Sequence, residues 1–176
     1  MKYFIDTEFI EDGKTIELIS LGAVCEDGRT FYAENVDVDW PKANPWVVEN
    51  VMPHLWNNPD TTGTKTWIAE QFLKFVGDHG SRFEHAEKPE FWGYYADYDW
   101  VVICQLYGTM MDLPRGWPMY CHDIKQYCDD LGNPQLPEQL STKHNALDDA
   151  IWNKHAYAFL RSHHLGMMAT DKTEVQ

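Results

Sequence analysis

Apolar residues gather near the start of the chain in runs that alternate with turn signals. The first run, residues 3–9, begins with apolar residues almost without a gap, which is typical of a strand buried on both faces. Residues 16–25 and 30–36 predict two more strands, and the pairs Asp12-Gly13 and Asp27-Gly28 mark hairpin turns before them. Three antiparallel strands are therefore expected to open the domain.

The remaining chain alternates between strand-like and helical patterns. We expect two further strands, at residues 90–96 and 119–124, and a polar loop at residues 57–63. Helices are predicted over residues 45–55, 64–80 with Gly77 or Gly80 as its stop, 100–107, 125–131 and 145–163. This order favours an α/β fold with a mixed five-stranded sheet and helices on both faces.

Length and composition limit the number of domains and the compartment. A chain of 176 residues with 44% hydrophobic residues suits one α/β domain, which we place at residues 1–165, followed by a polar C-terminal tail at 166–176. No apolar stretch is long enough for a membrane span, and Asp6 interrupts the segment where a signal peptide would be apolar. A cytoplasmic protein without a membrane partner is expected.

The cysteines do not suggest a metal site. None of the four forms a C-x-x-C pair, and each lies in an apolar or helical context where a buried thiol is the usual state. A zinc site formed by Cys121, His122 and Cys128 is an alternative, but their spacing fits no known zinc finger.

The net charge restricts how a nucleic acid could bind. A formal charge of -14 argues against holding long nucleic acid through a basic surface, since that mode depends on the release of counterions by Lys and Arg. A polyanionic substrate would have to be held locally, through bound metal ions and aromatic stacking.

A pair of carboxylates interrupts the first strand. Side chains repeat with period two along a strand, so Asp6 and Glu8 point to the same side, about 7 Å apart. Two like charges at the edge of a core repel each other, and a divalent metal ion is a common solution. By itself such a pair is more often a solvated strand end.

Other candidate residues lie at the ends of later elements. Asp99 follows the predicted strand at 90–96, and His144 and Asp149 lie at the start of the last helix. Five residues correspond to about 140° around a helix, so His144 and Asp149 cannot share one helical face. They can converge only if His144 precedes the helix on a loop.

Together, Asp6, Glu8, Asp99, His144 and Asp149 resemble the D-x-E, Asp and H-x4-D motifs of the DEDDh exonucleases, the DnaQ-like branch of the ribonuclease H-like superfamily. The segments YFIDTEFIEDGKTIELISLG, YDWVVICQLYG and HNALDDA are similar to those of mycobacterial polyadenylate-specific 3'-exoribonucleases. The resemblance covers most of the chain in the right order. It implies a ribonuclease H-like fold and a metal-dependent 3'-to-5' exoribonuclease that releases nucleoside 5'-monophosphates from single-stranded RNA 3' ends.

The resemblance also implies roles for these residues. His144 would be the general base, and two Mg²⁺ or Mn²⁺ ions would be held by Asp6, Glu8, Asp99 and Asp149. Two cations about 3.5–4 Å apart can activate a water and neutralise the leaving oxygen, and oxygen ligands suit these metals. Spacing alone would also allow Asp97 or Asp148 as ligands, and only the register of the motif favours their neighbours.

Substrate contacts are expected around the same residues. Thr7 and Phe9 flank the carboxylates, where related enzymes hold the terminal nucleotide, although Phe9 could equally belong to the core. Lys143 is a candidate phosphate contact. Stacking on a base is a weaker alternative to core packing for Tyr94, Tyr95 and Trp100.

Two rival functions remain at this point. The same motifs occur in nucleases that act on DNA during proofreading or repair, so DNA is the alternative substrate. A non-catalytic ribonuclease H-like binding module would be expected to lack one of the five residues, whereas all five are present. The resemblance also allows a homodimer, but no residue identifies its interface.

Overall fold

The computed structural model describes residues 1–77, 88–139 and 142–171. Its sheet has six strands in the order β4-β3-β2-β1-β5-β6. They are β1 (Lys2–Glu11), β2 (Ile16–Cys25), β3 (Thr30–Asn35), β4 (Thr62–Gly63), β5 (Glu90–Gly93) and β6 (His122–Asp123). β1, β2 and β3 are antiparallel neighbours, whereas β5 is parallel to β1, β6 to β5 and β4 to β3.

The mixed sheet predicted from the sequence is confirmed, but five strands were expected and the described residues form six. The additional strand β4 has only two residues and lies within the predicted polar loop. A strand this short has no alternation to detect, and only its pairing with Glu34 and Asn35 of β3 defines it. β5 and β6 are also shorter than predicted.

In the part of the chain that the structure describes, five α-helices connect and cover the strands. They are α1 (Pro45–Asn50), α2 (Lys65–Val76), α3 (Asp97–Tyr107), α4 (Ile124–Asp130) and α5 (Ala146–Asp171). α2 ends before Gly77, whose φ of 91° suits a glycine stop, and the alternative stop Gly80 lies outside the described residues. α3 begins three residues earlier than predicted.

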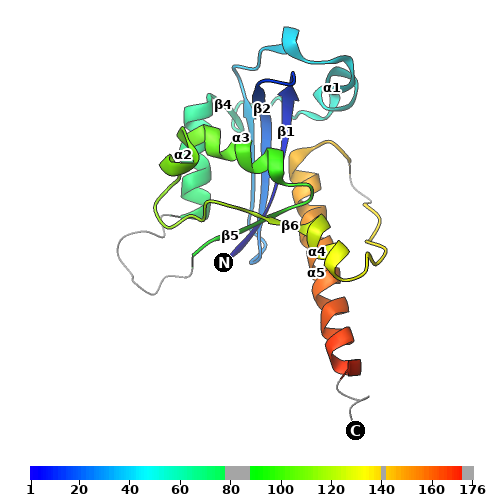
Figure 1. Cartoon of the computed structure of the whole chain (residues 1–176). Helices are drawn as coiled ribbons and strands as arrows, with labels where there is room; N and C mark the ends of the chain where they lie inside the picture. Colours follow the sequence, from blue (N-terminus) through cyan, green and yellow to red (C-terminus); the bar gives the residue numbers. More distant parts are fainter. Residues whose placement is uncertain (78–87, 140–141, 172–176) are drawn as a thin grey trace.

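The last helix is longer than its sequence pattern indicates. The prediction ended it at residue 163 and placed a polar tail from residue 166, whereas α5 continues to Asp171. Gly166 does not stop the helix, since a glycine ends a helix mainly where a left-handed conformation is needed. Figure 1 shows the C-terminal part of α5 extending away from the sheet.

The helices cover both faces of the sheet, as predicted (Figure 1). Tyr3 and Ile5 of β1 pack on one face in a core shared with α2 and α3. Phe4 points to the opposite face, where it joins residues of α4 and α5. The apolar start of β1 is therefore buried on both faces, which confirms the interpretation of this run as a central strand.

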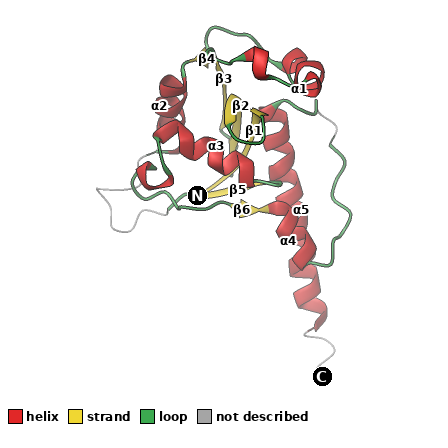
Figure 2. Ribbon diagram, turned by 45° about the horizontal axis from the view of Figure 1, so that its top comes forward, coloured by secondary structure: helices red, strands yellow, loops and turns green. Residues whose placement is uncertain are grey.

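The end of β1 is where three parts of the chain meet. A β-bulge between Glu8 and Phe9 shifts the register of β1 against β2, and bulges often occur where a strand must re-aim side chains at a site. The N-terminal end of α5 lies close against β2: an added Cβ on Gly22 would lie 2.1 Å from the carbonyl oxygen of Ala146. Figure 2 shows β1 and β2 between α3 and α5.

Within the described residues, no helix combines the length and apolar character that a bilayer crossing requires.

Candidate active site

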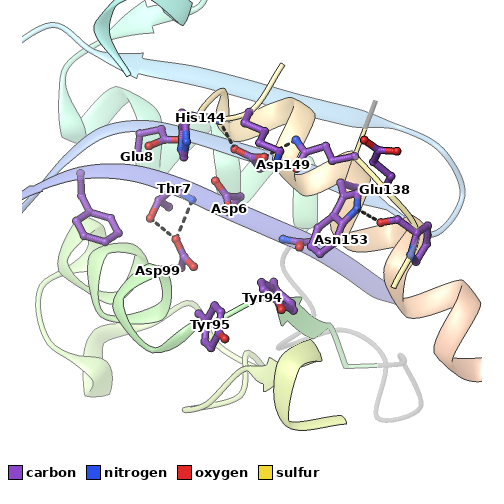
Figure 3. A pocket seen from close by; sticks show the side chains of 15 residues that line it. Asp6, Thr7, Glu8, Tyr94, Tyr95, Asp99, Glu138, His144, Asp149 and Asn153 are labelled. Carbon is purple, nitrogen blue, oxygen red and sulfur yellow. Dashed lines mark hydrogen bonds between the residues drawn. The ribbon is translucent and has the colours of Figure 1, made fainter. Parts of the chain in front are cut away.

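A pocket of about 570 Å³ lies beside the C-terminal half of β1 (Figure 3). Its walls come from β1, the turn after β5, the first turn of α3, the segment before α5 and α5 itself. It is lined by Asp6, Thr7, Glu8, Phe9, Tyr94, Tyr95, Asp99, Pro137, Glu138, Gln139, Lys143, His144, Asp149, Trp152 and Asn153. The five residues that resemble the DEDDh motifs therefore line one pocket.

The strand β1 supplies two of the carboxylates through its alternation. Asp6 and Glu8 lie opposite Gly22 and Ser20 of β2, two residues apart in the register. Glu8 is only 9% exposed. Figure 3 shows Asp6 between Asp99 and Asp149.

The carboxylate of Asp99 is held by Thr7. The backbone N–H and the hydroxyl of Thr7 both donate to Oδ1 of Asp99, at 2.8 and 2.6 Å. Asp99 lies in the first turn of α3 and is buried, whereas Asp97 is exposed and does not line this pocket. The geometry thus separates two aspartates that spacing alone could not distinguish.

His144 precedes α5, as the spacing required. Its backbone has a φ of 63°, and its N–H donates to Oδ2 of Asp149 at 2.9 Å. Nε2 of Gln139 donates to Oδ1 of the same carboxylate at 2.6 Å. Both oxygens of Asp149 are therefore oriented by the segment that precedes the helix, while Asp148 does not line the pocket.

Burial raises the pKa values of the four carboxylates, and repulsion from neighbouring carboxylates adds to the rise. The pKa of Glu8 rises to about 8, first through burial and then through the charges of Asp149 and Asp99. Burial raises the pKa of Asp99 to about 7, although the Thr7 hydrogen bonds oppose the shift. Burial followed by the other three carboxylates raises the pKa of Asp6 well above its usual value.

The pKa of Asp149 is also raised by burial, and the hydrogen bonds from Gln139 and His144 oppose the rise. Lys143 is the one Lys or Arg among the residues that line the pocket in the described part of the chain. The four acidic groups consequently lack a matching number of cationic side chains. Such a site favours the binding of cations, which would return the carboxylates to their ionised form.

The donor atoms fit a divalent cation. Ligand atoms of Glu8, His144 and Asp149 all lie within 4.8 Å of one another. Asp6 and Asp99 lie outside this tightest group but line the same pocket. Carboxylate oxygens dominate the set, and they are the ligands that Mg²⁺ and Mn²⁺ prefer.

The predicted substrate contacts are placed differently in the structure. Phe9 and Lys143 line the pocket, and the ring of Phe9 stacks on that of Tyr98 at 5.7 Å. The Thr7 hydroxyl is used to hold Asp99. Trp100 does not line the pocket: it is 7% exposed and packs in the core against Phe91 at 5.0 Å, so its position does not support a substrate contact.

Five lining residues were not identified as site residues from the sequence: Pro137, Glu138, Gln139, Trp152 and Asn153. The side chain of Asn153 donates to the carbonyl oxygen of Ile5 at 2.8 Å and so joins α5 to β1 beside Asp6. Asn153 lies four residues after Asp149, on the same helical face, so the helical spacing could have indicated it. Gln139 lies in an irregular segment whose sequence carries no comparable signal.

The alternative zinc site does not form within the described residues. The Cys121 thiol lies 3.7 Å from the carbonyl oxygen of Ala96, the His122 ring stacks on Trp92, and Cys128 is buried between the sheet and α5. The three side chains thus have separate surroundings, and no group of potential ligands found among the described residues includes them.

Comparisons with known proteins found relatives among the 3'-5' exoribonucleases. The profile of the 3'-5' exoribonuclease Rv2179c-like domain matches residues 1–160. The 3'-5' exoribonuclease Rv2179c of Mycobacterium tuberculosis H37Rv is 39% identical over 150 residues, which cover 85% of this chain and 87% of the relative.

Solved structures of nucleases share the fold. A structure of exonuclease I superposes with a TM-score of 0.60 at 13% identity, over 90% of this chain and 40% of the other. A 3'-exonuclease that recognises the 3' end of the histone mRNA stem-loop superposes with a TM-score of 0.55 at 14% identity, over 92% of this chain and 63% of the other. This chain therefore spans less than two thirds of either solved chain, and at these identities the likeness concerns the fold alone.

The sequence match covers nearly the whole chain, and the fold is that of ribonuclease H-like exonucleases. The chain belongs to the family of the 3'-5' exoribonuclease Rv2179c-like domain.

Proposed function

We propose that the protein is a metal-dependent 3'-to-5' exoribonuclease that removes nucleoside 5'-monophosphates from single-stranded RNA. The main observation is the joint placement of four buried or half-buried carboxylates and His144 in one pocket. Membership of an exoribonuclease family supports the same activity.

In this proposal, two Mg²⁺ or Mn²⁺ ions are held by Asp6, Glu8, Asp99 and Asp149. When bound, such a pair of cations lowers the pKa of the attacking water and neutralises charge on the leaving oxygen. Thr7 and Gln139 fix the orientations of Asp99 and Asp149 through hydrogen bonds. These ligands need not reorganise during the reaction, which lowers its barrier.

His144 is proposed to accept the proton from the attacking water. A neutral imidazole nitrogen can accept a proton in the transition state and release it afterwards. Its position before α5 brings the ring beside Glu8 and Asp149. Glu8 and Asp149 therefore lie within reach of the same water that His144 would deprotonate.

The RNA would be held only at its terminal nucleotides. The chain has a net charge of -14, which disfavours a long phosphate-binding track. Phe9 offers an apolar ring to the terminal base, and the exposed Lys143 offers a charge to a phosphate. The homodimer and the cytoplasmic location stay predictions from the sequence.

A time course on 5'-labelled single-stranded RNA and DNA oligonucleotides tests this function. The reactions contain Mg²⁺, Mn²⁺ or EDTA, and Asp6→Ala and His144→Ala are compared with the exposed-site control Asp97→Asn. We expect a ladder that shortens from the 3' end, faster on RNA, and that disappears in EDTA and in the first two variants.

Other outcomes would change the proposal. If DNA were shortened as fast as RNA or faster, a deoxyribonuclease would replace the exoribonuclease. If neither substrate were shortened with either metal, the non-catalytic binding module would become the better description.

A further inference from the structure

The indole of Trp46 lies against the imidazole of His144, although the two residues are far apart in the sequence. The ring centroids are 4.8 Å apart and the planes meet at 81°, an edge-to-face contact. Trp46 is 51% exposed and is not among the residues that line the pocket. An indole that remains so exposed contributes less to a core than a buried one, and its contact with His144 calls for another explanation.

The helix that carries Trp46 is fixed to the end of the sheet. The side chain of Asn44 accepts a hydrogen bond from the backbone N–H of Val47 at 3.0 Å and so caps α1. Val47 and Val51 are buried against Ile10 and Ile19 of β1 and β2. Figures 1 and 2 both show α1 beyond the ends of these strands, on the side where α5 begins.

A second contact joins the same part of the chain to the start of α5. The side-chain amide of Asn145 donates to the carbonyl oxygen of His54 at 2.9 Å. Its oxygen accepts from the backbone N–H groups of Leu147 and Asp148, both at 3.2 Å, and Asn145 is only 4% exposed. Two consecutive residues, His144 and Asn145, are thus held by the segment between β3 and β4.

The backbone contacts of His144 leave its side chain free to rotate. The N–H bond to Asp149 fixes the main chain, but rotation about the Cα–Cβ bond would still move the imidazole away from the pocket. The Trp46 ring restricts this rotation from the side. We infer that Trp46 is a positioning residue that orients the imidazole of His144 toward the attacking water, an assignment that rests on the proposed function.

The role predicts a specific kinetic pattern. Loss of the indole leaves the carboxylates and the substrate contacts in place, so substrate binding is unchanged while proton transfer becomes less efficient. General-base catalysis contributes about 10²–10⁴-fold, and partial misorientation should cost roughly 10-fold in kcat. A ring that instead stacked on a base of the RNA would mainly affect KM.

The test compares Trp46→Ala and Trp46→Phe with Trp56→Ala. Trp56 is a matched control, since it is 50% exposed, lies in the same connection and packs on Tyr32 rather than on the site. We expect Trp46→Ala to lower kcat about 10-fold with KM within 2-fold, and both Trp46→Phe and Trp56→Ala to remain near the wild-type value. In a His144→Ala background, Trp46→Ala should not lower kcat further, because the indole acts only through the His144 ring.

A measurement without substrate accompanies the kinetics. The NMR signals of the His144 ring, assigned by their loss in His144→Ala, should shift in Trp46→Ala and stay unchanged in Trp56→Ala, because the indole ring current is removed. Thermal unfolding of each variant identifies any that fail to fold; if Trp46→Ala does, Trp46→Leu, which keeps an apolar side chain but no ring, replaces it in both the kinetics and the NMR comparison.

Three results would overturn the inference. They are a rise in KM with kcat unchanged, an equal loss in the His144→Ala background, and unshifted His144 signals in Trp46→Ala. If the wild-type protein degrades RNA and depends on His144 while Trp46→Ala has no effect, the inference fails and the proposed function stands. If the wild-type protein degrades neither RNA nor DNA, the proposed function fails first.

Discussion

The close approach of β2 to α5 gives a direct test of how the site is assembled. Gly22 lies opposite Asp6 in the sheet, and its missing side chain leaves room for the first turn of α5. In Gly22→Ala, the added Cβ would lie 2.1 Å from the Ala146 oxygen and 2.3 Å from the Leu147 nitrogen. Both are backbone atoms, so no flexible side chain can move aside.

The size of the effect follows from these distances. Carbon atoms pack at about 3.5–4.0 Å, so the start of α5 must move by roughly 1 Å or more to accept the methyl group. His144 and Asp149 move with it, relative to Asp6 and Glu8. A displacement of this size can reduce catalysis by about 10²-fold, and overpacking costs about 1–3 kcal/mol of stability.

The assay measures kcat on single-stranded RNA and the affinity for Mn²⁺, with urea denaturation for stability. Gly166→Ala is the matched control, since it lies in α5 with nothing within 4 Å of an added Cβ. The control should keep full activity and gain about 0.5–1 kcal/mol. If Gly22→Ala kept wild-type kcat and Mn²⁺ affinity, the close contact would not be what positions the start of α5.

Three further predictions follow from the site. The raised pKa values of Glu8, about 8, and Asp99, about 7, mean that the metal-free native state binds more protons than the unfolded state between about pH 4 and 8. The free energy of unfolding in EDTA should therefore fall as pH rises through that range, by about 1 kcal/mol per carboxylate and pH unit. Urea denaturation measures this free energy, and an equal or greater value at pH 8 than at pH 5 would contradict the prediction. Asp99→Asn should lower kcat by roughly 100-fold or more through weaker metal binding, whereas Asp97→Asn should keep the wild-type kcat. If Asp97→Asn lost activity and Asp99→Asn kept it, Asp97 would be the metal ligand instead of Asp99. Asn153→Ala removes the hydrogen bond that this side chain donates to the buried carbonyl of Ile5 and should cost about 1–3 kcal/mol in urea denaturation, whereas an unchanged midpoint would show that this bond does not stabilise the protein.

The sequence was sufficient to predict those features that depend on the pattern of neighbouring residues. The apolar start of β1 predicted a strand buried on both faces, and the residues alternate as expected between the two cores. The spacing of His144 and Asp149 required the histidine to precede the helix, and it does. These inferences depend on backbone periodicity, which neighbouring residues determine by themselves.

The sequence was less reliable where an element is defined by distant partners. β4 exists only through its pairing with β3, and the length of α5 was underestimated because residues 166–176 were interpreted as a polar tail, whereas the helix continues to Asp171. Trp100 was a candidate for stacking on a base, although core packing was favoured, and its packing against Phe91 places it in the core.

The sequence by itself determined the kinds of residues available for chemistry and the order in which they occur, because motifs and periodicity are properties of the chain. Only the tertiary structure decided which aspartate faces the pocket, that Gln139 orients Asp149, and that Trp46 meets His144. These contacts join residues that are distant in the chain or that lie in irregular segments. Their positions depend on how the sheet and helices pack, which no local pattern encodes.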